Sequence, residues 1–208
     1  MISRARQVYQ TRYRGYDRFG RVRRQFWVGS NGGSPVPHAD IFWYGYDYAG
    51  NRLFRNIEAT VYSGDDKYQA YEYDGLHRLS QMERGTWNGS TLNNPNFEQD
   101  WSLDQLGNWA NFVEKTSGGV TLDQDRSHNL ANEITNITTN TGSSWIIPGH
   151  DAAGNMTSAP SAHDPTKRHW YVYDAWNRLV EVWEDDGDST KEIAGGSPDD
   201  TLIARYEY

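Results

Sequence analysis

One column of residues constrains the fold of this chain more than any other sequence feature. Seven times, an Asp or Asn follows a ring or apolar residue and opens a short polar stretch; these anchors are Asp17, Asp47, Asp74, Asp104, Asn129, Asp151 and Asp174. Three residues after each anchor the chain carries only Gly, Asn or His, at Gly20, Gly50, His77, Gly107, Asn132, Gly154 and Asn177. A column with so few residue types indicates one backbone requirement that recurs in every repeat.

That requirement is a positive φ angle. Glycine enters the left-handed region freely, and Asn and His are among the few other residues enriched there. An anchor Asp or Asn can accept a hydrogen bond from the backbone two residues later and so fix the start of a turn. A short loop with a left-handed residue near its end is a common hairpin connection. The column therefore predicts a β-hairpin turn in each repeat.

The residues that flank the turns have the pattern of strands. Large side chains alternate before several anchors, as in Tyr71 and Tyr73 or Tyr171 and Tyr173, and this alternation places both on one sheet face. We expect these rings to stack against their equivalents in the next hairpin. Apolar residues return two positions after the column, except that Arg52 precedes Leu53 in the second repeat. We therefore expect the register of that repeat to shift by one residue.

The repeats extend through the whole chain as one array. Successive anchors are separated by 30, 27, 30, 25, 22 and 23 residues. Turn-forming linkers of variable length account for this drift, and they are expected at residues 29–40, 88–96, 159–165 and 184–200. No domain boundary is evident, so residues 1–208 are predicted to form a single array of about seven repeats.

Composition agrees with an all-β fold. The 208 residues include 9 Trp, 14 Tyr and 20 Gly. Aromatic residues fit the pleated surface of a sheet, and each ring buries a large area. The prediction is an all-β protein of consecutive antiparallel β-hairpins in a curved, spiralling sheet.

The Tyr-Asp-x-x-Gly-Arg-Leu pattern, clearest in "YDRFGRV", "YDYAGNRL" and "YDAWNRL", resembles the RHS/YD-repeat family of bacterial RHS toxins, YD-shell proteins and the teneurin shell. The resemblance covers about Tyr13 to Tyr208. It implies that the hairpins are part of a hollow β-shell, which in toxin members encloses a C-terminal effector. This chain lacks the self-cleaving core segment of such toxins. Seven hairpins are too few to close a shell, so an open curved sheet is expected.

By this resemblance, the chain is expected to be a non-catalytic structural segment of a secreted or cell-surface bacterial protein that encapsulates or presents a C-terminal toxin or effector. Its partner is then the remainder of its own polypeptide. The final "YEY" repeats the approach to an anchor and ends where the next anchor would fall, which suggests a fragment of a longer protein. No signal peptide is expected in the chain. An exposed edge strand would favour self-association.

A carbohydrate-binding module is the alternative function. Trp27, Trp43, Trp87, Trp145 and Trp170 fall near strand ends or linkers, where indole rings can stack on sugars. Trp43 and Trp145 are the candidate glycan-stacking residues. Packing between hairpins is the favoured interpretation of these rings.

An enzyme is disfavoured. The chain has no Cys and no Gly-x-Ser-x-Gly motif, and the anchor carboxylates recur too often for catalytic groups. No cofactor or metal is expected, because a site at His163 and His169, or a calcium loop at Glu184, Asp186 and Asp188, is less plausible than ordinary loop structure.

The partner classes follow from charge and hydropathy. A net charge of −8 argues against nucleic acid, although residues 1–24 hold eight Arg, interpreted as solvated strand faces and loops. No membrane span is expected.

Overall fold

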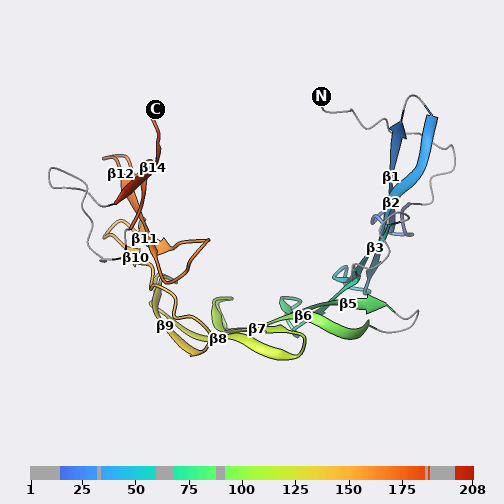
Figure 1. The fold of residues 1–208 in the computed structure, drawn as a ribbon. Helices are drawn as coiled ribbons and strands as arrows, with labels where there is room; N and C mark the ends of the chain where they lie inside the picture. Colours follow the sequence, from blue (N-terminus) through green and yellow to red (C-terminus); the bar gives the residue numbers. More distant parts are fainter. Residues whose placement is uncertain (1–14, 32–33, 60–67, 88–91, 186, 188–199) are drawn as a thin grey trace. The chain divides into compact units, whose positions relative to one another are not determined.

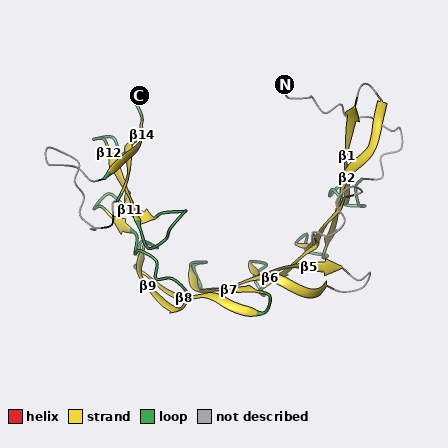
Figure 2. Cartoon of the chain, in the orientation of Figure 1, coloured by secondary structure: helices red, strands yellow, loops and turns green. Residues whose placement is uncertain are grey.

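The computed structural model describes residues 15–31, 34–59, 68–87, 92–185, 187 and 200–208, with the side chains of residues 26–40 and 58–59 left out. Every regular element in these residues is a β-strand, and the strands pair antiparallel (Figure 2). The all-β prediction is thus confirmed. No helix in the described ranges is long and apolar enough to span a membrane.

The strands follow one another in two sheets, with sequence neighbours paired (Figure 1). The first sheet has the order β1 to β9: Arg24–Asn31, Ser34–Tyr46, Arg52–Ala59, Tyr68–Tyr73, Leu79–Trp87, Leu92–Leu103, Trp109–Thr116, Gly119–His128 and Ile134–Thr141. The second has the order β10 to β14: Gly149–His150, Met156–Pro160, Arg168–Tyr173, Leu179–Glu184 and Thr201–Arg205. Pairing of consecutive strands is the topology expected of hairpin repeats.

Contacts between Cα atoms divide the chain into two compact units. The first comprises Met1–Trp101 and Glu114–Gly119, and the second comprises Ser102–Val113 and Val120–Tyr208. The expectation of a single array, and that of a curved, spiralling wall, stay predictions.

The hairpins share one register. Tyr73 pairs with Leu79, and Tyr173 pairs with Leu179, each next to a β-bulge. Tyr46 pairs with Arg52 in the same way, so the expected one-residue shift in the second repeat is wrong. The Arg52 guanidinium lies 4.9 Å from the centre of the Tyr44 ring. A cation–π contact therefore occupies the place of the usual apolar residue, and the turn keeps its length.

All four expected linkers overlap strands. The linker expected at residues 29–40 lies mostly within β1 and β2, and the one at residues 88–96 overlaps the start of β6. Those at 159–165 and 184–200 begin with the last residues of β11 and β13, and residues 186 and 188–199 of the latter lie outside the described residues. Turn-forming residues alone misplace these strand ends because Pro and Asn are tolerated at edges and bulges. The turn between β7 and β8, where Ser117 and Gly118 both have positive φ, was not predicted, although Ser-Gly-Gly is a turn-forming sequence.

Few apolar side chains are buried. Among the described residues the buried hydrophobic ones are Tyr68, Phe112 and Leu122. Ring contacts between neighbouring strands supply part of the remaining packing. Gly45 permits one such contact, because a Cβ atom at this position would overlap the Phe54 ring on β3. The structure thus depends strongly on backbone ladders and cross-strand pairs.

Candidate functional site

The repeated turn is the best-defined site in the chain. In the fourth repeat, Asp104 Oδ1 accepts from the backbone N–H of Leu106 at 2.8 Å and of Asn108 at 2.9 Å. Asp104 Oδ2 accepts from Asn108 Nδ2 at 2.9 Å. The Gly107 N–H donates to the Asp104 carbonyl at 3.2 Å. One carboxylate therefore closes the loop and fixes the side chain that leaves it.

All seven residues of the predicted column have positive φ. The angles are 79° at Gly20, 101° at Gly50, 62° at His77, 92° at Gly107, 63° at Asn132, 84° at Gly154 and 58° at Asn177. The N–H of each of these residues donates to the carbonyl of its own anchor. The structure thus places the fourteen anchor and column residues in one recurring turn.

The residue after the column completes the turn by pairing with the anchor side chain. It is Arg or Asn wherever the anchor is Asp, as in Arg78 Nε to Asp74 Oδ2 at 2.7 Å. The fifth repeat exchanges the two roles: Asn129 Nδ2 donates to Glu133 Oε2 at 2.6 Å. A donor thus always faces an acceptor, whichever position carries the acid.

The Asp anchors are held in their ionised form. The side-chain hydrogen bond from Asn108 and the backbone N–H donors lower the pKa of Asp104, although partial desolvation opposes them. In the same way, the bond from Asn155 lowers the pKa of Asp151. Both carboxylates are engaged by their own turns, so they serve as local scaffolds.

Successive turns also contact each other. Asn108 Nδ2 donates to Asn132 Oδ1 at 3.0 Å, and Asn155 Nδ2 donates to Asn177 Oδ1 at 2.9 Å. Asn51 Nδ2 lies 2.9 Å from His77 Nδ1. In each case the residue after one column position bonds to the column residue of the next repeat.

In two of the three cases in which the next column residue is Gly, a longer side chain reaches toward it, whereas a Cβ atom on Gly107 would have no neighbour within 4 Å. Arg21 Nη1 donates to the Asp47 carbonyl at 2.9 Å, and a Cβ atom on Gly50 would lie 3.8 Å from this nitrogen. A Cβ atom on Gly154 would lie 3.7 Å from Glu133 Oε1. From the second repeat onward, a column Gly followed by Asn alternates with a column His or Asn followed by Arg or Glu. The short Asn amide bonds to the His or Asn of the next turn, and Gly50 and Gly154 leave room for longer side chains.

A second contact joins consecutive repeats along the strands. The hydroxyl of the tyrosine before an anchor, or of Tyr208 at the equivalent position, donates to the carbonyl of the residue two positions after the preceding column residue. The four cases are Tyr46 to Val22 at 2.9 Å, Tyr73 to Arg52 at 2.9 Å, Tyr173 to Met156 at 3.0 Å and Tyr208 to Leu179 at 3.0 Å. The hydroxyl thus attaches each of these strands to the preceding hairpin, a role that ring alternation alone did not predict.

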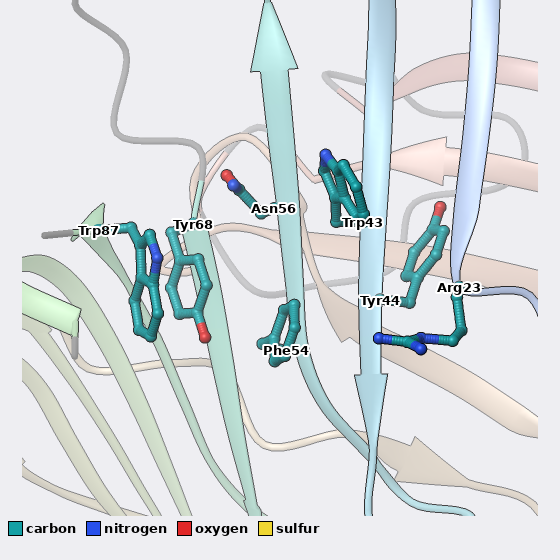
Figure 3. A pocket seen from close by; sticks show the side chains of 7 residues that line it. All are labelled: Arg23, Trp43, Tyr44, Phe54, Asn56, Tyr68 and Trp87. Carbon is teal, nitrogen blue, oxygen red and sulfur yellow. The ribbon is translucent and has the colours of Figure 1, made fainter. Parts of the chain in front are cut away.

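An aromatic hollow lies in the first unit (Figure 3). Its volume is about 200 Å³, and it is lined by Arg23, Trp43, Tyr44, Phe54, Asn56, Tyr68 and Trp87. The Phe54 and Tyr68 rings stack with their centres 5.5 Å apart, and the Tyr68 and Trp87 rings at 4.4 Å. Figure 3 shows these three rings side by side across neighbouring strands. The stacking covers both faces of the buried Tyr68 ring, whereas Trp87, which is 41% exposed, leaves ring surface available to a flat ligand.

The two candidate glycan-stacking residues belong to different units. Trp43 lines the hollow, and the Arg24 guanidinium lies 4.0 Å from its ring centre. Trp145 lies in the second unit with the Arg126 guanidinium 5.6 Å from its ring centre. A cation therefore lies near one face of each ring. Trp170 has the same arrangement with Arg168, at 4.7 Å.

The metal-site and basic-segment candidates of the sequence do not come together as a site among the described residues. In the described part of the chain, no three His, Asp or Glu side chains are grouped for a metal ion. His163 follows Ser161 in a loop, whereas His169 belongs to β12. Asp186 and Asp188 of the calcium-loop candidate lie outside the described residues, as do residues 1–14 of the basic segment.

Comparison with known proteins finds no matching family model and no matching curated protein. Among solved structures, similarity extends to a Tc holotoxin pore of Photorhabdus luminescens, with 13% identity over 80% of this chain and a TM-score of 0.40. Two crystal structures of TcdB2-TccC3, one without the hypervariable C-terminal region, share 12% identity over 82% of this chain, with TM-scores of 0.42 and 0.43. This chain spans about a tenth of the length of these toxin chains.

Proposed function

We propose that this chain is a non-catalytic structural section of an RHS/YD-type β-hairpin wall. The observation that carries the proposal is the repeated bonding between consecutive hairpins. Tyrosine hydroxyls attach strands to the preceding repeat, and the turns are joined through Asn51, Asn108 and Asn155. Each repeat thus contacts its neighbours through the same groups, which is how a repeat array extends.

The state of the carboxylates supports a structural role over a catalytic one. Asp17, Asp74 and Asp174 are paired with Arg21, Arg78 and Arg178 in their own turns, and Asp104 and Asp151 are bonded to amides. A general acid or base needs a group free to exchange a proton with substrate. These aspartates are already saturated by donors within the turn.

The proposal also concerns the kind of protein to which the hairpin wall belongs. By the resemblance of its repeats, the wall belongs to a secreted or cell-surface bacterial protein and encloses or presents a C-terminal effector of the same polypeptide. The chain's binding partner is then the rest of that polypeptide, which supplies further repeats and the effector.

Limited proteolysis of the parent polypeptide tests this function. The segment that follows the repeats is expected to resist protease while the wall is intact. The double variant Gly107→Val and Gly154→Val should expose it, because both residues need positive φ. Gly75→Ala is the matched control, because Gly75 has open space around it and no positive φ. Equal cleavage in the parent and in the double variant would refute enclosure.

A carbohydrate-binding module is the second candidate, favoured by the stacked rings of Phe54, Tyr68 and Trp87 beside the polar groups of Asn56 and Arg23. Glycan-array binding that Trp43→Ala or Trp87→Ala abolishes, with the circular dichroism spectrum unchanged, would support this function. Trp145→Ala tests the candidate in the second unit. An array without any bound glycan would exclude it.

A further inference from the structure

The second unit contains a cationic side chain, Arg126, that lies among aromatic rings. Arg126, on β8, is partly buried, and no ion pair joins it to a carboxylate in the described residues. Its Nε atom is buried without a hydrogen-bond partner. Burial also lowers the pKa of Arg126. An uncompensated charge in such a place is costly, so binding of an anion there would stabilise the folded chain.

Three aromatic rings surround the guanidinium. Its central carbon lies 4.9 Å from the Trp109 ring centre, 5.8 Å from that of Phe112 and 5.6 Å from that of Trp145. Phe112 is 5% exposed, and its ring stacks with Trp109 at 5.3 Å. The rings stabilise the cation, but they offer no acceptor to its buried Nε donor.

Two further polar groups beside Arg126 lack partners. Gln124 is 0% exposed, and Arg126 Nη2 donates to its Oε1 at 3.0 Å. This bond directs the amide oxygen toward the guanidinium and leaves Nε2 buried without an acceptor. Thr139 pairs with Gln124 across the β8–β9 ladder, and its buried Oγ1 also has no partner. Unpaired polar atoms of this kind are rare in folded proteins.

We infer that Arg126, Gln124 and Thr139 form a binding site for one carboxylate group. The amide, the guanidinium and the hydroxyl can all donate, so the complementary ligand is rich in acceptors. Two carboxylate oxygens can accept from Gln124 Nε2 and from the Arg126 side chain, and their charge neutralises the cation. A water molecule would satisfy Nε2 but leave the charge uncompensated.

Acetate titration of the full chain tests the site, with sodium chloride at equal ionic strength as the reference. Binding is followed through the fluorescence of the tryptophans and through the side-chain amide signal of Gln124 by NMR. We expect saturation with a dissociation constant of about 1–10 mM, as a single charge-assisted pair supports. Arg126→Met and Gln124→Leu should each weaken acetate binding about tenfold or more.

Arg178→Met is the matched control, because this guanidinium also lies over a ring, that of Trp176 at 5.3 Å, but is paired with Asp174. It should bind acetate as the parent does. If Arg126→Met does not fold, Thr139→Val serves as the second variant beside Gln124→Leu. Identical acetate and chloride titrations of the parent, or unchanged acetate binding in Gln124→Leu, would overturn the inference.

A second ligand distinguishes the sources of the carboxylate. N-acetyl-glutamate methylamide that binds at least as tightly as acetate would identify an acidic side chain of a polypeptide as the natural ligand. Binding more than about tenfold weaker would identify a free small carboxylate, since one lost charge-assisted contact corresponds to that factor.

Discussion

The two kinds of turn make the same chain reversal with different side chains. Gly50, Gly107 and Gly154 have φ between 84° and 101°, whereas His77, Asn132 and Asn177 have φ between 58° and 63°. The second group lies close to the ideal left-handed conformation, and glycine spreads beyond it because it has no Cβ. The required feature is thus the positive φ. Which residue supplies it varies with the side chain that the preceding turn places next to it.

That dependence divides the array into pairs of repeats. Asn51, Asn108 and Asn155 each follow a glycine and bond to a His or Asn of the next turn. Arg21 and Glu133 instead reach toward Gly50 and Gly154. At these contacts a short amide meets a short polar side chain, and a long charged side chain meets a glycine, whereas Gly107 has no such neighbour. The comparison indicates that neighbouring turns are matched to each other as well as to their own strands.

Acidification is expected to have the largest effect, because it acts on six Asp anchors together. Hydrogen bonds to its carboxylate lower the pKa of Asp104, and the anchors at positions 17, 47, 74, 151 and 174 shift in the same direction. The stability they contribute is present above the unfolded pKa, about 4, and is lost as the pH falls through the lower folded values.

Hydrogen exchange between pH 6 and pH 2.5, corrected for intrinsic rates, measures this loss turn by turn. Protection of the Leu106 and Asn108 amides, which bond to Asp104, should fall with acid. Protection of the Ala131 amide, which bonds to the uncharged Asn129, should change less. Equal losses at both turns would contradict the role of the carboxylates.

Substitution of a glycine by a β-branched residue should have the next largest effect. Gly107→Val is expected to reduce the free energy of unfolding by about 1–3 kcal/mol, the range for strained backbone, because a Cβ atom there meets no neighbour and only the φ of 92° is at issue. Chemical denaturation measures it. Asn132→Gly should change stability by less than about 1 kcal/mol. A Gly107→Val variant as stable as Gly75→Ala would refute the conformational requirement.

The fifth repeat offers a charge test. Asn129→Asp places a second carboxylate against Glu133, which now accepts from Asn129 at 2.6 Å. We expect a loss of about 0.5–1 kcal/mol at neutral pH, the size of a like-charge repulsion on a surface. Adding Glu133→Asn re-creates the arrangement of the fourth repeat and should restore stability. A double variant no more stable than Asn129→Asp alone would show that the donor at one position does not compensate for the acid at the other.

The smallest expected effect is the coupling between neighbouring turns. A double-mutant cycle of Asn108→Ala and Asn132→Ala should give about 0.5 kcal/mol, because the bond between them is exposed. The cycle of Asn108→Ala with Asn177→Ala pairs turns with no mutual bond and should give a coupling near zero. Equal coupling energies in the two cycles would contradict the claim that bonded neighbouring turns form pairs.

The sequence alone predicted the all-β class and the residues that turn the chain, because backbone requirements restrict residue choice directly. It failed at Arg52, where apolar character was taken as the marker of register. Register follows from turn length, and a guanidinium over the Tyr44 ring fills an apolar position adequately. The identity of one residue does not reveal which side chain on the neighbouring strand it contacts.

The contacts between repeats were not predictable for the same reason. The Tyr73 hydroxyl bonds to a carbonyl 21 residues earlier in the chain, and Arg126 gathers rings from β7 and from beyond β9. Such contacts depend on which strands become neighbours. From the second repeat onward the sequence alternates Gly-Asn with His-Arg, Asn-Glu or Asn-Arg. Which of these side chains bond to each other depends on the distance between turns, which the sequence does not show.

The φ angles of His77, Asn132 and Asn177 in solution test the central claim most directly, since these residues enter the left-handed region only where the fold requires it. NMR backbone couplings and chemical shifts of the full chain determine them. The account predicts a positive φ at all three, near the values of 62°, 63° and 58°. A negative φ at these positions, in extended or helical backbone, would contradict the hairpin turn on which the whole array depends.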